Sequence, residues 1–256
     1  MRLPTRHEIY PVLVVLFLFQ LLSAEPPSLP FFTLPPFIAP GLYAIVKALV
    51  DIVVVQYTHF LQTLLRIVEG MAAAFVLGVA WGILNAFSGR LERSTAMLLK
   101  MIIGVPGLCW VIIAVIWFSN TELRILFVIV ITSFPFYAMN VLDGIKGVPI
   151  DYVEMIKSFR PRETQIVRYL IIPFITPYVL TTTKVVLGYA TRIVILAELV
   201  GAGVGVGAQL QLAQEFFEIE SVYAWTLLLM TFVLISEALI ETSEAHLLKW
   251  RPKELL

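Results

Sequence analysis

The stretch LQTLLRIVEGMAAAFVLGVAWGILNAF, residues 61–87, decides the fold class of this chain. It runs for 27 residues and carries only two charged side chains, Arg66 and Glu69. A helix needs about 20 predominantly apolar residues to cross the hydrocarbon of a bilayer. The stretch lacks the alternation of apolar and polar residues that a membrane β-strand shows. It therefore predicts a membrane-spanning α-helix.

The composition of the whole chain agrees with this prediction. The chain has 256 residues, of which 59% are hydrophobic and 14% are charged, and its mean hydropathy is +0.91. A soluble domain is about 45–50% apolar and about 25% charged. These values exclude a water-soluble enzyme, a disordered chain and a nucleic-acid binder. We expect no catalytic residue, metal or cofactor, because Cys109 is the one cysteine and no hydrolase or zinc motif occurs.

Similar apolar runs predict an all-α integral membrane protein with about six spans and one transmembrane domain over residues 1–256. The other predicted spans are 10–24, 97–118, 125–142, 169–199 and 223–240. Pro173 and Pro177 are expected to break or bend the helix over 169–199. Segment 10–24 is short and follows two arginines, so it is either a retained helix or a signal-like segment.

The basic residues set the predicted orientation. Segment 38–57 carries Lys47 and Asp51 at its middle, and we interpret it as an interfacial helix at the outer surface. With that assignment both termini are cytoplasmic, and 13 of the 18 Lys and Arg residues lie on the cytoplasmic side. Counting 38–57 as a seventh span would place five basic residues of segment 143–168 outside, so we reject it.

The longest predicted cytoplasmic connection, 143–168, contains a pair of short helices. The first is expected to begin near Pro149, with Asp151 placed to cap its free amides, and to end at Phe159. Pro161 disfavours a helical conformation at Arg160, and a second helix follows from Arg162. Such a pair would suit docking of a soluble partner, whereas an ordinary solvated loop is the alternative.

This connection resembles the EAA loop of binding-protein-dependent ABC importer permeases. Glu154 stands at the position of the family's Glu, Ile172-Pro173 stands at the end of the motif, and Arg160 replaces the family's turn glycine. Residues 149–168 would then be the coupling loop, and Arg160-Pro161 is not expected to copy a left-handed turn. The residues that the resemblance implies for ATPase coupling are Glu154, Lys157, Phe159, Arg160 and Arg162.

The resemblance extends over about residues 34–252, and the order of its marks is most similar to the nitrate, taurine and aliphatic-sulfonate branch. The marks are LLRIVEG at 64–70, Pro106, VIWF at 115–118, PFITPYV at 173–179, AEL at 197–199, GVG at 205–207 and HLLKWRP at 246–252. The permease core would cover 61–242.

The resemblance implies the inner-membrane subunit of an importer that catalyses nothing itself. A second copy or a homologous partner, two cytoplasmic ATPases and an external solute-binding protein would complete the machine, which would work by alternating access. The implied solute is nitrate, taurine or another sulfonate, or bicarbonate. The alternatives are an ABC-linked lipid-trafficking permease, an importer of a neutral heterocycle such as a vitamin precursor, and a membrane scaffold.

Charges within the predicted spans are costly and mark functional candidates. Lys184, Gly188 and Arg192 recur every four residues and share one helix face, which suits an anion passing through a cavity. In the alternative, Lys184 extends to the cytoplasm and Arg192 pairs with Glu69 or Glu198. The predicted substrate-pathway residues are Arg192, Lys184, Gly188, Glu198 and Glu69.

A glycine-rich segment follows the fifth predicted span. No Lys-Ser or Lys-Thr follows it, so it is not a P-loop. Gly203, Gly205 and Gly207 are interpreted as a flexible outer gate, with simple helix-end punctuation as the alternative. Ala74, Gly78 and Gly82 form a small-residue face on the second span, whose partner helix the sequence leaves open.

Overall fold

The computed structural model describes Gln20, residues 38–86 and residues 88–247. Within these ranges every regular element is a helix. Four helices are long and apolar enough to span a membrane, and a bent helix pair brings the number to five. The predicted first segment, 10–24, lies outside the described residues except for Gln20. The all-α membrane fold is confirmed, and the sixth span stays a prediction.

Helices α3 (Tyr57–Ala86) and α6 (Thr121–Lys146) form the central pair of the bundle. The small residues of α3 permit this packing, because a Cβ atom on Gly78 would lie 2.5 Å from Cβ of Tyr137 and 2.8 Å from the carbonyl oxygen of Phe134. A Cβ atom on Gly82 would lie 2.8 Å from the carbonyl oxygen of Ala138. The partner of the small-residue face is therefore α6 of the same chain.

The fifth predicted span is one continuous helix, so the predicted break at its prolines does not occur, while a bend at them stays a prediction. Helices α8 (Glu163–Ile166), the π-helical turn η1 (Val167–Ile171) and α9 (Ile172–Leu199) form one 37-residue helix. In the π turn the N–H of Ile172 donates to the carbonyl of Val167, five residues earlier. Pro173 lies directly after the π turn and Pro177 lies further along α9, so both prolines are inside the continuous helix.

The predicted span over 97–118 is divided into two helices. Helices α4 (Gly89–Gly104) and α5 (Gly107–Trp117) cover this region, and their axes are bent by 95°. Pro106 separates them, since it has no N–H and Val105 before it is extended, with ψ 126°. The pair is therefore a broken span or a re-entrant loop.

The remaining helices pack around this core. Helix α11 (Ile219–Leu247) contacts α2 (Leu42–Val55), α9 and α10 (Val206–Glu215). Buried Ile45 and Ile52 of α2 pack with Trp225 of α11. At 14 residues α2 is too short to cross a bilayer. Its location at the membrane surface stays a prediction.

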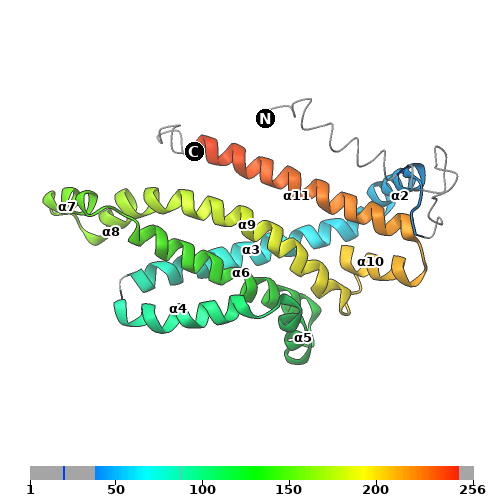
Figure 1. Ribbon diagram of the computed structural model, residues 1–256, viewed down its shortest axis with the longest axis horizontal. Helices are drawn as coiled ribbons and strands as arrows, with labels where there is room; N and C mark the ends of the chain where they lie inside the picture. Colours follow the sequence, from blue (N-terminus) through cyan, green and yellow to red (C-terminus); the bar gives the residue numbers. More distant parts are fainter. Residues whose placement is uncertain (1–19, 21–37, 87, 248–256) are drawn as a thin grey trace.

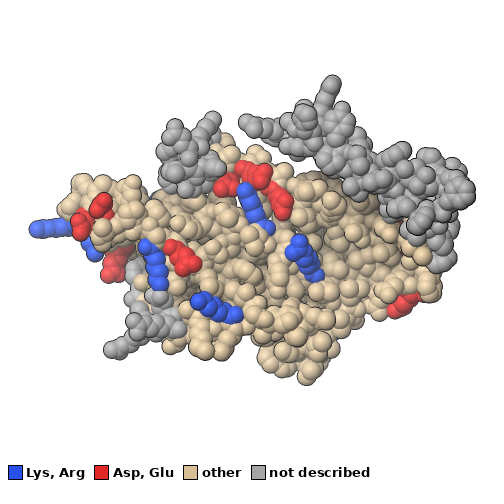
Figure 2. Space-filling view, viewed as in Figure 1, with Lys and Arg blue, Asp and Glu red and all other residues tan. Residues whose placement is uncertain are grey.

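The two ends of the molecule differ. Figure 1 shows an elongated bundle with α7 (Ile150–Ser158) and α8 at one end and α2 and α10 at the opposite end. Figure 2 shows that charged side chains on this face gather toward the α7 end and in the region between α9 and α11. The long apolar helices therefore connect two chemically distinct ends.

Candidate functional site

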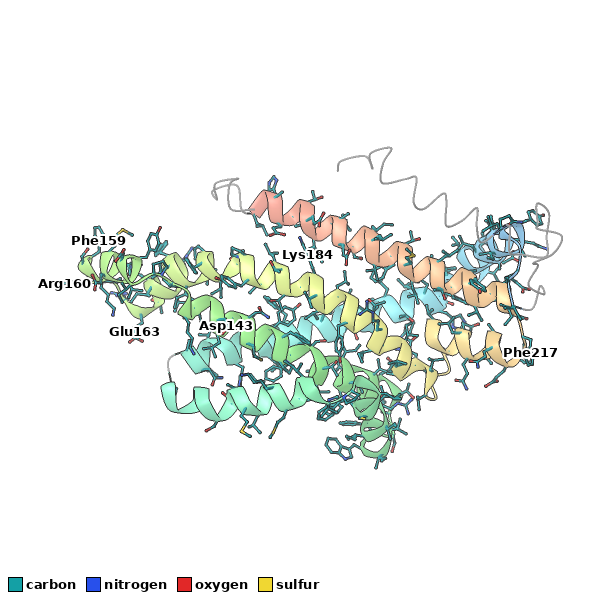
Figure 3. All side chains as sticks on the ribbon, viewed as in Figure 1. Asp143, Phe159, Arg160, Glu163, Lys184 and Phe217 are labelled. Atoms are coloured by element: carbon teal, nitrogen blue, oxygen red, sulfur yellow. The ribbon has the colours of Figure 1, made fainter. Side chains whose placement is uncertain are left out.

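The predicted coupling loop forms a helical tip at one end of the bundle. Helix α7 begins after Pro149, which occupies the N-cap, and Asp151 lies in its first turn rather than at the cap. No residue of α7 is buried. Figure 3 places Phe159 and Arg160 at the extreme end of the tip. The Phe159 side chain is 80% exposed, which is unusual for an aromatic residue outside a binding surface.

The turn at this tip corrects one sequence prediction. Arg160 has φ +48° and so adopts the left-handed conformation that we expected it to avoid. Hydrogen bonds on both sides favour the turn: the Arg160 N–H donates to the Lys157 carbonyl over 2.9 Å, and the Arg162 N–H donates to Oε1 of Gln165 over 2.8 Å. Local hydrogen bonds of the turn and of the α8 cap therefore override the conformational preference of an arginine.

The five predicted coupling residues lie together and exposed on this tip. They are Glu154, Lys157, Phe159, Arg160 and Arg162. Exposed apolar side chains lie among them: Ile150, Tyr152 and Met155. A protruding helix with a mixed apolar and charged surface has the composition of a docking surface for a soluble protein.

The predicted substrate-pathway residues on α9 do not all carry a free charge, because Lys184 forms ion pairs with α11. Nζ of Lys184 lies 2.7 Å from Oε2 of Glu244 and 3.7 Å from Oε1 of Glu241, both on α11. Figure 3 places Lys184 between α9 and α11. The expected doubly cationic face is therefore reduced, because the charge of Lys184 is matched by carboxylates.

Arg192 keeps its charge unmatched. Its side chain is exposed and makes no ion pair with any residue that the structure describes. Gly188, one turn earlier, borders open space, since an added Cβ atom would meet no atom within 4 Å. The predicted alternative, a pair of Arg192 with Glu69 or Glu198, does not occur in the described part of the chain. Glu69 is exposed, and Glu198 has another partner.

That partner is Arg66, which the sequence analysis did not connect to Glu198. Oε1 of Glu198 lies 2.6 Å from Nη1 of Arg66, and the Thr63 hydroxyl donates to the same carboxylate over 2.8 Å. The Gly207 N–H donates to Oε2 over 2.8 Å. Glu198 is 0% exposed and Arg66 is 5% exposed. A buried carboxylate is tolerated only when it is bonded this fully.

The glycine-rich segment wraps around this carboxylate. Gly205 has φ +130° and forms the N-cap of α10, and an added Cβ atom there would lie 2.5 Å from the Glu198 carboxylate. A Cβ atom on Gly207 would lie 2.5 Å from Cβ of Glu198. Gly203 borders open space. Gly205 and Gly207 therefore permit close packing, and their role in a gate stays a prediction.

Arg66 also joins the start of α6 to this cluster. Its Nε donates to Oε2 of Glu122 over 2.9 Å, and its Nη1 donates to the carbonyl of Val204 over 2.7 Å. The Glu122 side chain is 55% exposed. One guanidinium thus connects α3, α6, α9 and the turn before α10. No group of three His, Cys, Asp or Glu side chains among the described residues is placed to hold a metal ion.

Comparison with known proteins identifies a family. Residues 74–249 match the family described as "Binding-protein-dependent transport system inner membrane component". The putative aliphatic sulfonates transport permease SsuC of Bacillus subtilis is 29% identical over 196 residues, which cover 76% of this chain and 71% of SsuC. Other relatives are named as bicarbonate, taurine and nitrate permeases.

Two further matches bear on the solute and on the fold. The formylaminopyrimidine transport permease ThiX of Halalkalibacterium halodurans is 27% identical over 221 residues, which cover 86% of this chain and 88% of ThiX. A chain of the MetNI methionine ABC transporter, solved in inward-facing conformations, aligns with a TM-score of 0.59 and 16% identity over 81% of this chain and 96% of that chain. The latter match shows the fold alone.

Proposed function

Because this chain belongs to the family of binding-protein-dependent transport system inner membrane components, we propose that it is the permease subunit of an ATP-binding-cassette importer for a small anionic solute. The observation that carries the proposal is the family match over residues 74–249. The chain would form a multi-pass pathway in the inner membrane and would work by alternating access. It would catalyse nothing itself, and partner ATPases would hydrolyse ATP.

We assign the α7–α8 tip to the ATPase contact. The exposed Phe159, with Glu154, Lys157, Arg160 and Arg162 around it, would dock into the ATPase. Since α8 continues into α9 as one helix, a movement of the tip would be transmitted along α9 toward Arg192. This continuity supports a coupling role, because a rigid helix transmits displacement better than a flexible loop.

The proposed orientation places the α7–α8 tip in the cytoplasm and the α10 end outside, with both chain termini cytoplasmic. Phe159 and Phe217 provide a matched test, because they lie at opposite ends and are 80% and 79% exposed. In a Cys109→Ser background, an impermeant maleimide applied to intact cells should label Phe217→Cys and spare Phe159→Cys. The reverse labelling would invert the proposed topology.

The proposed solute is anionic because Arg192 is exposed, has no ion-pair partner among the described residues and lies one turn after Gly188, which borders open space. The sulfonate named for SsuC is consistent with this choice. Nitrate, taurine, another sulfonate or bicarbonate would fit the same chemistry. Lys184 would contribute less to the anion, since Glu244 already holds it.

We further propose three kinds of partner. These are two ATPases at the tip, a solute-binding protein at the α10 end, and a second permease copy or a homologous subunit that completes the pathway. Gly203, Gly205 and Gly207 would belong to the outer gate, and Glu198 and Glu69 would lie near it. No cofactor is required by this scheme.

The test is purification of the complete complex, with its ATPase and solute-binding protein, followed by mass spectrometry of the small molecule that co-purifies. We expect an anion that the binding protein releases on denaturation. A neutral heterocycle, as the name ThiX would suggest, or a phospholipid would overturn the assignment of an anionic solute. Failure of the chain to associate with any ATPase would overturn the importer assignment itself.

A further inference from the structure

Two carboxylates contact the guanidinium of Arg66, and a third lines a cavity beside it. Glu198 and Glu122 both form ion pairs with Arg66. Glu69 follows Arg66 by three residues on α3 and lines the same small cavity as Arg66 and Glu122. Glu69 is exposed and has no ion-pair partner among the described residues. A third carboxylate without a partner beside a buried arginine needs an explanation.

The Glu198 half of the cluster is closed. Glu198 is fully buried and holds the Thr63 hydroxyl and the Gly207 N–H as well as Arg66. Separating it from Arg66 would leave a buried charge without its counter-ion, which is strongly unfavourable. This half therefore stays formed whatever the rest of the protein does.

The Glu122 half is open. Glu122 lies in the first turn of α6 and is 55% exposed, so water can hydrate its carboxylate when the ion pair breaks. Arg66 is buried and holds Glu122 through two hydrogen bonds, so breaking this pair costs more than breaking a surface salt bridge. The pair can therefore break in a functional cycle only if another carboxylate takes over the outer side of Arg66. The pair ties the start of α6 to α3, so its breakage would free that end of α6.

Glu69 supplies the replacement partner. Residues three apart on a helix are neighbours, so the carboxylate of Glu69 can reach a guanidinium at position 66. Arg66 would then keep a second carboxylate after Glu122 leaves, and the exchange would bury no unpaired charge. The two arrangements differ only in which helix holds the outer side of Arg66, and this is the property of a two-state element.

We propose that Arg66 is a positioning residue of the transport cycle, which pairs with Glu122 to hold the start of α6 while the outer end is closed and with Glu69 while it is open. The inference rests on the proposed function, because it assumes an importer whose outer end opens when its ATPases close. Glu122 and Glu69 therefore act in opposite directions on the same equilibrium.

Because Glu122 and Glu69 are proposed to act in opposite directions, removing each charge should have opposite effects. A merely structural role of Arg66 does not predict this. The variants Glu122→Gln and Glu69→Gln remove the same charge from the same cavity, and Glu215→Gln on α10 is a matched control at an exposed glutamate outside the cluster. Each variant would be assembled with ATPase subunits in nanodiscs, and ATP hydrolysis would be measured without binding protein. Spin labels at positions 65 and 123, on α3 and α6, would report the outer separation in a Cys109→Ser background.

We expect Glu122→Gln to raise basal hydrolysis by roughly threefold or more and to lengthen the label distance, as expected for the loss of one partly exposed ion pair. Glu69→Gln should lower basal hydrolysis by roughly the same factor and shorten or sharpen the distance distribution. Glu215→Gln should match the wild type. Changes of the same sign in the two test variants, or no change in either, would overturn the exchange.

The outcomes separate this inference from the proposed function. A wild-type complex whose hydrolysis and uptake respond to the binding protein, but whose two variants do not diverge, would refute the exchange at Arg66 alone. A wild-type complex without any response to a binding protein would refute the importer. In that case the label distances in the permease still decide whether Glu122 and Glu69 compete for Arg66.

Discussion

The carboxylate of Glu198 lies 2.6 Å from the guanidinium of Arg66, which precedes it by 132 positions in the chain, and neither side chain is more than 5% exposed. This pair joins the C-terminal end of α9 to α3 at the end of the bundle opposite α7. The same carboxylate accepts a hydrogen bond from the Gly207 N–H in the first turn of α10. The pair therefore fixes the turn between α9 and α10 as well as the two long helices.

Removal of one partner of this pair should be far more damaging than removal of both. Arg66→Met leaves Glu198 buried without a counter-ion and should destabilise the protein by about 3–5 kcal/mol. Arg66→Met combined with Glu198→Met removes both charges and should recover part of that loss. Thermal unfolding of the purified protein in detergent measures both. If the double variant lost as much stability as Arg66→Met and Glu198→Met lose together when measured separately, the two side chains would not interact.

Gly207 should tolerate no side chain. The Cβ atom of Gly207→Ala would lie 2.5 Å from Cβ of Glu198 and 2.6 Å from the carbonyl oxygen of Ile195, so backbone must move. We expect a loss of roughly 1–3 kcal/mol, the usual range for overpacking. Gly203→Ala is the control, because its Cβ atom would meet no atom within 4 Å. Equal melting temperatures for the two variants would contradict the close packing of α10 on α9.

Phe159 should be required for assembly with the ATPase. Phe159→Asp places a charge at the exposed tip and should abolish co-purification of the ATPase, and Glu154→Arg should weaken it. Phe217→Asp is a matched control, since Phe217 is equally exposed at the opposite end. Retention of the ATPase by Phe159→Asp, or its loss from Phe217→Asp, would place the ATPase contact elsewhere.

Replacing Arg160 by glycine should stabilise the turn between α7 and α8. An L-residue in the left-handed conformation costs roughly 1–2 kcal/mol, whereas glycine adopts it freely. Arg160→Gly should therefore slow proteolysis of the tip between α7 and α8. Faster cleavage of the tip would indicate that Arg160 does not adopt φ +48° in solution, because glycine would then only increase the freedom of the unfolded chain.

The spans, the exposed helix pair and the family could be predicted from the sequence, because long apolar runs and ordered short motifs are local signals. The bend at Pro106 was missed although the proline is visible, since the apolar run continues across it without a change of composition. A run of apolar residues predicts burial in lipid, but it does not predict whether the helix axis changes direction within the run.

The cluster around Arg66 could not be predicted in the same way. Arg192 was the expected partner of Glu69 or Glu198, and Arg66 was noted only as one of the two charged side chains of residues 61–87. Contacts between α3 and α9 depend on how both helices pack around α6. The spacing of residues along a single helix does not reveal how it packs against other helices. The left-handed Arg160 was missed for a related reason, since its turn is fixed by hydrogen bonds at both ends.

The central claim is that this permease imports an anion past Arg192. The direct measurement is ATP-dependent uptake of the co-purified ligand into proteoliposomes that contain the assembled complex, with wild type compared with Arg192→Ala. We predict uptake by the wild type, and roughly a tenfold or greater loss in Arg192→Ala, as expected for a lost hydrogen bond to a charged group, with the complex still assembled. Undiminished uptake by Arg192→Ala, or ATP-driven uptake of a neutral solute, would contradict the claim.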